Sequence, residues 1–192
     1  MVEKVTFKPG TMLNPVPVVM VSCGKYDINP NIITVAWAGT VCSDPPMLSI
    51  SLRKQRFSYD IIKESGFFVV NLVDGNLIRA ADWCGVKSGR DFNKFQQTGL
   101  TPIKAAGSDC CMIEQSPVNI ECEVKQIIPL GTHDMFLAEV KSVHVNACLI
   151  DKTGRLDLTK ADLSVYSHGV YHKLGHETGT FGFSVKKINL KK

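Results

Sequence analysis

The segment Ser49–Ser58 carries the densest set of side chains that could do chemistry. Hydroxyl groups alternate with apolar residues up to Ser51, and the chain then runs through Arg53 and Arg56 into Ser58. Guanidinium groups pair with oxyanions through parallel hydrogen bonds, and the first turn of a helix presents free backbone N–H groups. These residue types predict a cradle for a phosphate group. A solvated basic turn between a strand and a helix is the alternative, and such turns are common.

A second segment, residues 31–43, has small side chains that would let a flat ring approach the backbone. Ala36, Ala38 and Gly39 leave room above the main-chain N–H and C=O groups. An ordinary buried strand with Trp37 in the core explains the same residues, and taken alone it is the better interpretation.

Three histidines are spaced four residues apart, at His168, His172 and His176. On a helix they would line one face and could bind a metal ion. Gly169 and Gly175 argue against a regular helix in this segment. The spacing by itself therefore does not predict a metal site.

The composition describes one globular domain. A chain of 192 residues fits a single domain, and 44% hydrophobic with 21% charged residues is ordinary for that class. The formal net charge of +4 is too small to indicate a nucleic-acid-binding protein, although it is compatible with a small anionic ligand. The uncharged stretches Thr11–Gly24 and Asn29–Ser43 are interrupted by Gly and Pro, so neither is expected to span a membrane.

The seven cysteines indicate a reducing compartment. Their number is odd, no C-x-x-C pair occurs, and residues 1–8 lack the apolar stretch of a secretion signal. We therefore expect free thiols in a cytoplasmic protein. The adjacent Cys110 and Cys111 could be redox active, but no basic neighbour in the sequence lowers their pKa, and a buried inert thiol is the commoner case.

The elements that must position these residues are mostly strands. Apolar runs and period-two alternation predict strands at 17–24, 32–40, 47–52, 67–73, 118–125 and 135–150. Short helices are expected at 58–66, 74–84 and 92–97, with Ser58 as the N-cap of the first and Gly66 as its stop. The strands form two meanders rather than βαβ units. The sequence thus predicts a mainly antiparallel β-barrel with peripheral helices.

Several ordered strings in the chain match one known family. They are Asn31–Arg53 with Arg56–Ser58, Ser65–Leu72, Cys84–Gly85 with Ser88–Asp91 and Lys94–Phe95, Pro117–Cys122, Gly131–Asp134 and Gly179–Ser184. Together they extend over about Pro15 to Ser184, and the chain resembles the flavin reductase-like family, more narrowly its flavoredoxin branch. The resemblance implies one FMN-binding domain over residues 1–192, with a Greek-key split β-barrel. It also implies a homodimer with each flavin near the subunit interface.

The resemblance further implies which residues bind FMN. The isoalloxazine ring would be lined by Thr34, Ala36, Trp37 and Thr40, with Asn31 beside them. The ribityl phosphate would be held by Ser51, Arg53, Phe57 and Ser58. The site would be closed by Cys84, Gly85, Ser88, Gly89 and Lys94, with Tyr171 in the segment near the cofactor. That last segment contains His168 and His172, which favours a wall of the flavin site over a metal site. Many relatives carry Pro and Tyr where this chain has Lys54 and Phe57, so a phenol hydrogen bond is lost.

The implied function is that of an oxidoreductase. NADH or NADPH would pass a hydride to FMN, and the reduced flavin would pass electrons to an acceptor. No side chain is expected to act as an obligatory acid or base; backbone N–H groups of residues 36–41, helped by Lys94, would stabilise the reduced anion. The alternative is a flavoredoxin-like electron carrier that holds FMN tightly and exchanges electrons with redox proteins. Neither nucleic acid nor a membrane is an expected partner.

Overall fold

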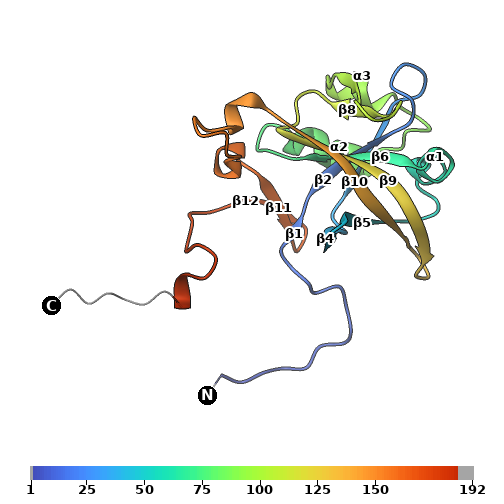
Figure 1. Ribbon diagram of the computed structural model, residues 1–192. Coiled ribbons are helices and arrows are strands. Elements are labelled where there is room, and N and C mark those ends of the chain that lie inside the picture. The colour runs from blue at the N-terminus through green and yellow to red at the C-terminus, as the bar shows by residue number, and fades with distance from the viewer. Residues whose placement is uncertain (1, 186–192) are drawn as a thin grey trace.

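The computed structural model describes residues 2–185 and builds them around a seven-stranded antiparallel sheet (Figure 1). Its strands, in chain order, are β2 (Val19–Cys23), β3 (Asn31–Val35), β4 (Ala38–Ser43), β5 (Pro46–Leu52), β6 (Phe67–Leu72), β9 (Val118–Pro129) and β10 (Asp134–Val145). Their order across the sheet is β3-β2-β6-β9-β10-β5-β4. Because β2 lies beside β6 and β5 beside β10, the order is that of Greek-key connections rather than of a simple meander.

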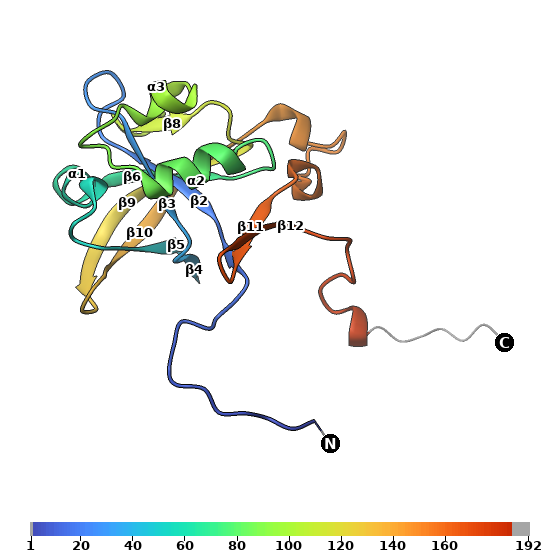
Figure 2. The same ribbon diagram turned by 180° about the vertical axis from the view of Figure 1, so that it is seen from behind.

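Smaller elements surround this sheet. The strands β1 (Val16–Pro17), β11 (Ser164–Ser167) and β12 (Val170–Lys173) form a three-stranded sheet, and β7 (Pro102–Lys104) pairs with β8 (Cys111–Ile113). The helices are α1 (Phe57–Ser65), α2 (Ile78–Val86) and α3 (Lys94–Thr98), with short 3₁₀ turns at Ala147–Leu149, Leu158–Ala161 and Phe183–Val185. Seen from behind, α2 crosses in front of the sheet, and both terminal segments run away from the body (Figure 2). Among residues 2–185, no helix is long and apolar enough to cross a membrane.

The central strands are apolar on both faces because both faces are covered. In β2, Val21 packs with Phe136 and the residues of α1, whereas its neighbour Met20 packs with the residues of α2 and α3. Ile33 and Ile32 of β3 divide between the same two clusters. This period-two alternation, combined with burial of both faces, explains why the strands read as continuous apolar runs.

The predicted strand at 32–40 is wrong in one respect that matters for the site. The chain breaks at Ala36–Trp37, where the backbone N–H of Ser51 donates to the Trp37 carbonyl at 2.9 Å. β3 and β4 on either side of this break are the two edges of the seven-stranded order. The break is therefore the corner at which the chain passes directly from one edge of the barrel to the other.

Other predictions met mixed outcomes. Gly66 ends α1 with a φ of 73°, as expected, but the prediction of Ser58 as the N-cap is wrong: the N-cap is Arg56, without a side-chain bond. The second helix begins at Ile78 rather than at residue 74, the third covers Lys94–Thr98, and the last long strand ends at Val145. All seven cysteines are free thiols, as predicted.

Candidate functional site

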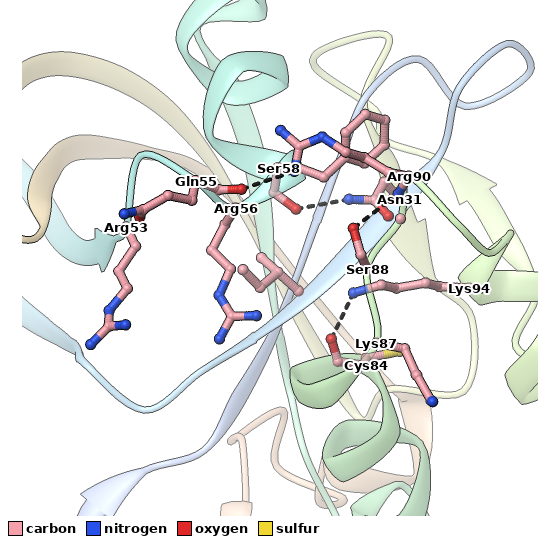
Figure 3. A pocket seen from close by; sticks show the side chains of 13 residues that line it. Asn31, Arg53, Gln55, Arg56, Ser58, Cys84, Lys87, Ser88, Arg90 and Lys94 are labelled. Atoms are coloured by element: carbon pink, nitrogen blue, oxygen red, sulfur yellow. Dashed lines mark hydrogen bonds between the residues drawn. The ribbon is translucent and has the colours of Figure 1, made fainter.

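A cavity of about 420 Å³ lies at the Asn31 end of β3, the end away from the corner (Figure 3). Its wall comes from β3, from residues 53–58 between β5 and α1, and from residues 84–94 between α2 and α3. Eight of the predicted site residues line it: Asn31, Arg53, Phe57, Ser58, Cys84, Ser88, Gly89 and Lys94. The topology thus joins two segments about thirty residues apart into one concave surface.

The cavity is strongly basic. Five cationic side chains line it, those of Arg53, Arg56, Lys87, Arg90 and Lys94, and no carboxylate does. The Cys84 thiol does not offset this charge, because burial, against the lowering effect of Lys94, raises the pKa of Cys84 to about 11. The lining therefore favours an anion of more than one charge.

Lys94 is the most unusual of these cations because it is buried. Its side chain belongs to a residue only 4% exposed, and Nζ donates to the Cys84 carbonyl at 2.6 Å. Burial lowers the pKa of Lys94 below its usual value. Within residues 2–185 this carbonyl is the single hydrogen-bond partner of an ammonium that has three donors. An anion in the cavity would satisfy the remaining donors and offset the desolvation of the charge.

The floor of the cavity is polar and tightly built. The Asn31 side-chain amide donates to the Ser58 hydroxyl at 2.8 Å, and both residues are buried. The loop from α2 closes against this pair at Gly89, where an added Cβ would stand 2.3 Å from Asn31 Oδ1 and 2.6 Å from Phe57 Cδ1. Only glycine lets the backbone come so close.

A smaller hollow of about 150 Å³ continues the cavity along β3. It shares Ile33, Arg53 and Arg56 with the first cavity and reaches the corner residues. Four more predicted site residues line it: Thr34, Ala36, Trp37 and Ser51. The Thr34 hydroxyl donates to the Ala81 carbonyl of α2, which leaves the backbone of β3 as the surface of the hollow.

Beyond the corner lies a third hollow of about 790 Å³. It shares Ala36 and Trp37 with the second, and its other walls are residues 10–16 and the turn between β11 and β12. His168 lines it, but no lysine, arginine, aspartate or glutamate does. The three hollows form a path from a strongly basic cavity at Asn31 to a hollow without those four residue types beyond Trp37.

Three predicted residues do not line these hollows. Thr40 lies on β4 opposite Leu48, and Gly85 stands behind the wall, where a Cβ would meet Thr34 at 3.3 Å. The Tyr171 hydroxyl donates to Asp82 Oδ1 at 3.0 Å, and burial together with Asp82 raises its pKa to about 12. These side chains support the site from behind or lie outside it.

The histidine segment forms two strands rather than a helix. His168 lies in the turn between β11 and β12 with a φ of 48°, and His172 lies on β12. The helical face that the metal hypothesis requires is therefore not formed. Within residues 2–185 no group of three ligating side chains could hold a metal ion.

Sequence reasoning missed four polar residues that line the first two hollows, Gln55, Lys87, Arg90 and His133, together with the apolar Ile33, Val35 and Leu52. The basic residues on either side of Ser88 and Gly89 were a signal for Lys87 and Arg90. The signal for His133 was its place in Gly131–Asp134, one of the strings that match the family, and the residue reaches the site from the turn between β9 and β10. The ring of His133 packs on that of Trp37, with the ring centroids 4.4 Å apart. Burial, and after it the positive charges of Arg53 and Arg56, lower the pKa of His133.

Comparison with known proteins identifies the family of the chain. The profile of the flavin reductase like domain family matches residues 11–175. The structure of flavoredoxin from Desulfovibrio vulgaris (Miyazaki F) is 30% identical, with a TM-score of 0.88 over 96% of this chain and 100% of that chain. A flavin reductase-type protein from Shewanella frigidimarina with a split barrel domain is 17% identical, with a TM-score of 0.78 over 86% of this chain and 85% of that chain. The latter likeness confirms the split-barrel fold.

Among curated sequences, the FMN reductase (NADH) RutF of Shigella dysenteriae serotype 1 is 25% identical over 117 residues, which are 57% of this chain and 72% of the relative. The chain spans between 42% and 73% of the length of the curated relatives that it matches.

Proposed function

The chain belongs to the flavin reductase-like family and its flavoredoxin branch, and from this membership we propose that it is an FMN-binding oxidoreductase. The observation that carries the proposal is the buried Lys94 ammonium, with one carbonyl partner, in a cavity lined by five cations and no carboxylate. A phosphate monoester is a compact dianion at neutral pH, and such a lining suits it.

The residues present fit FMN from end to end. Lys94, Arg53 and Arg56 would pair the phosphate, and the Asn31–Ser58 pair offers further polar atoms. The ribityl chain would follow β3 past Ile33, which lines both the first and the second hollow. The ring system would then reach the corner at Ala36–Trp37, where side chains are small or aromatic.

When bound, FMN supplies the hydride and electron chemistry, and the protein supplies its position and electrostatic surroundings. The backbone N–H groups at the corner of β3 and β4 would donate to the polar edge of the ring, where reduction adds negative charge. Arg53 and Arg56 line both hollows, so their charge would favour the reduced anion as well as the phosphate. His133, with its lowered pKa, would stay neutral and pack on Trp37.

The proposed electron donor is NADH or NADPH, and the name of the RutF relative, FMN reductase (NADH), supports a nicotinamide nucleotide in this role. A second candidate function is that of an electron carrier, and it is favoured by one observation: the likeness to flavoredoxin, at 30% identity, extends over 96% of this chain. The hollow beyond Trp37 is where a second reactant would approach the ring in either case.

Two measurements test these proposals. The visible spectrum of the purified protein, and quenching of flavin fluorescence on titration with FMN, report whether flavin binds; no binding would overturn both functions. Anaerobic mixing with NADH and with NADPH then separates them. Rapid bleaching of the flavin supports the reductase, whereas bleaching only by a reduced redox protein supports the carrier.

We also propose that the protein acts as a homodimer. The support is the exposed apolar surface at the corner and its edge strand, where Trp37 is 44% and Val41 51% exposed. The terminal segment before β1 adds Leu13, which is 87% exposed. Light scattering coupled to size-exclusion chromatography tests this proposal, and a monomeric mass at micromolar concentration would contradict it.

A further inference from the structure

The two halves of the basic cavity are joined by one exposed side chain. Arg90, in the loop after α2, donates from Nη1 to the Gln55 carbonyl at 2.9 Å. Its guanidinium carbon lies 5.5 Å from the centre of the Phe57 ring, within the range of a cation–π contact. Figure 3 shows this bridge crossing from the loop to the turn before α1. We call Arg90, Gln55 and Phe57 the clasp.

The loop that carries Arg90 is held in place by its own bonds. The Ser88 hydroxyl accepts from the Arg90 backbone N–H at 3.1 Å, and the Ser88 carbonyl accepts from the Phe92 N–H at 3.2 Å. Gly89 brings the loop against Asn31 with no room for a Cβ. The clasp is therefore the outer closure of a loop that is already tightly seated.

The clasp closes one particular end of the path. Gln55, Phe57 and Arg90 line the first cavity and not the second, whereas Trp37 lines the second and not the first. A flavin whose ring lies at Trp37 would bring its phosphate to the clasp. Any group attached beyond that phosphate would have to pass where Arg90 crosses to Gln55.

We propose that the clasp makes this site selective for the mononucleotide FMN over the dinucleotide FAD and slows the release of bound FMN. This inference rests on the proposed function. FAD carries a second phosphate and an adenosine on the phosphate at which FMN ends, so FAD binds only with the clasp open. FMN binds with the clasp closed, and the positive charge of Arg90 also attracts its phosphate.

A rival explanation makes Arg90 simply one more cation. The two explanations predict different values for one measurable quantity, the ratio of the dissociation constant of FAD to that of FMN. Loss of a charge weakens both flavins through the phosphate that they share, so the ratio of their dissociation constants stays constant. Loss of the clasp weakens the binding of FMN but removes an obstacle to the binding of FAD, so the FAD-to-FMN ratio of dissociation constants falls. Lys87 offers a matched control because it lines the same cavity and its ammonium contacts Phe92 rather than Gln55 or Phe57.

The experiment measures dissociation constants for FMN and FAD by fluorescence quenching, and the FMN release rate by dilution into a flavin-binding competitor. Proteins compared are the wild type, Arg90→Ala and Lys87→Ala, each stripped of flavin and checked for folding by thermal unfolding. We expect Arg90→Ala to lower the FAD-to-FMN ratio of dissociation constants about tenfold and to speed FMN release about tenfold, the effect of losing one hydrogen bond from a charged donor. Lys87→Ala should leave the ratio unchanged.

Equal ratios in both variants would overturn the clasp and leave Arg90 as a charge. If Arg90→Ala fails to fold, Phe57→Leu removes the aromatic face under the guanidinium while keeping an apolar side chain, and it should lower the same ratio. Failure of the proposed function looks different, because the wild type would then bind neither flavin.

Discussion

Replacing Lys94 by Met should stabilise the flavin-free protein and weaken FMN binding at the same time. Met keeps an unbranched apolar stem of similar length but removes the ammonium. In the flavin-free protein that ammonium is buried, with the Cys84 carbonyl at 2.6 Å as its partner. A residue that only holds the fold together would change both properties in the same direction.

For the flavin-free protein, two opposing contributions decide whether Lys94→Met raises or lowers the free energy of unfolding. Loss of the ammonium leaves the Cys84 carbonyl without this donor, which costs about 1–3 kcal/mol. Loss of a buried charge removes a desolvation penalty of several kcal/mol, reduced here because the cavity admits water. The second term exceeds the first by about 1 kcal/mol, which corresponds to a rise in Tm of about 2–4 °C for a chain of this size.

The pH dependence checks the same reasoning. Because burial lowers the pKa of Lys94 in the folded protein below its usual 10.5, the unfolded chain holds this proton more tightly than the folded chain does. The free energy of unfolding of the flavin-free wild type should therefore rise with pH between the lowered pKa and about 10.5. Lys94→Met should lack this contribution to the slope.

Binding of FMN should change by a larger factor. A hydrogen bond to a charged group contributes about 1.5–3 kcal/mol, so FMN affinity should fall about 10- to 150-fold. At an FMN concentration of about 100 times the wild-type Kd, bound flavin stabilises the wild type by about 2.7 kcal/mol. A variant with about 100-fold weaker affinity gains only about 0.4 kcal/mol at that concentration.

Thermal unfolding with and without FMN measures both effects in one instrument. Lys87→Met is the matched control because its ammonium is exposed, so its removal should leave the flavin-free Tm unchanged and weaken FMN only modestly. Unchanged FMN affinity in Lys94→Met would show that the phosphate lies elsewhere. A flavin-free Tm that falls by several degrees would show that Lys94 is a structural tie, and either result refutes the reasoning.

Three further predictions concern two residues of the cavity and one carboxylate outside it. Arg53→Ala should weaken FMN by about 1.5–3 kcal/mol in a fluorescence titration, and unchanged affinity would remove Arg53 from the phosphate site. Gly89→Ala should abolish tight FMN binding, because its Cβ would stand 2.3 Å from Asn31 Oδ1; binding like that of the wild type would show that the loop yields freely. Burial raises the pKa of Glu121, but hydrogen bonds from two backbone N–H groups and His144 outweigh this and lower it. Its stabilising contribution is thus present above about pH 4.5 and is lost as the pH falls through the lowered pKa, and Glu121→Gln should flatten that part of a stability-against-pH curve.

Local patterns predicted most of the sheet because they report burial directly. The alternation over residues 118–125 correctly placed β9, and Gly66 ended α1 because only glycine takes its left-handed conformation readily. The break at Ala36–Trp37 carries no such local signal, since neither residue disfavours a strand. It depends on the bond from the Ser51 N–H to the Trp37 carbonyl, which forms only when β5 is in place.

The hairpin of β11 and β12 was missed although a signal existed. His168 and Gly169 both have positive φ, 48° and 83°, the pair that a two-residue type I′ turn requires. The pairing of Ser167 with Val170 closes that turn. The helical spacing of three histidines drew attention to a metal site instead. The burial of Lys94 and the clasp on Arg90 are also beyond local patterns, because each depends on residues brought together from distant segments.

The distribution of ion pairs gives the strongest reason to regard the cavity as an anion site. Elsewhere in the described part of the chain, six lysines pair with carboxylates, among them Lys125 with Glu123 at 2.7 Å and Lys173 with Asp162 at 2.6 Å. None of the five cations around the cavity has such a partner among residues 2–185. Five of the 22 basic residues of the sequence therefore gather around one cavity without a carboxylate, where burial of Lys94 makes the positive charge costly unless an anion binds.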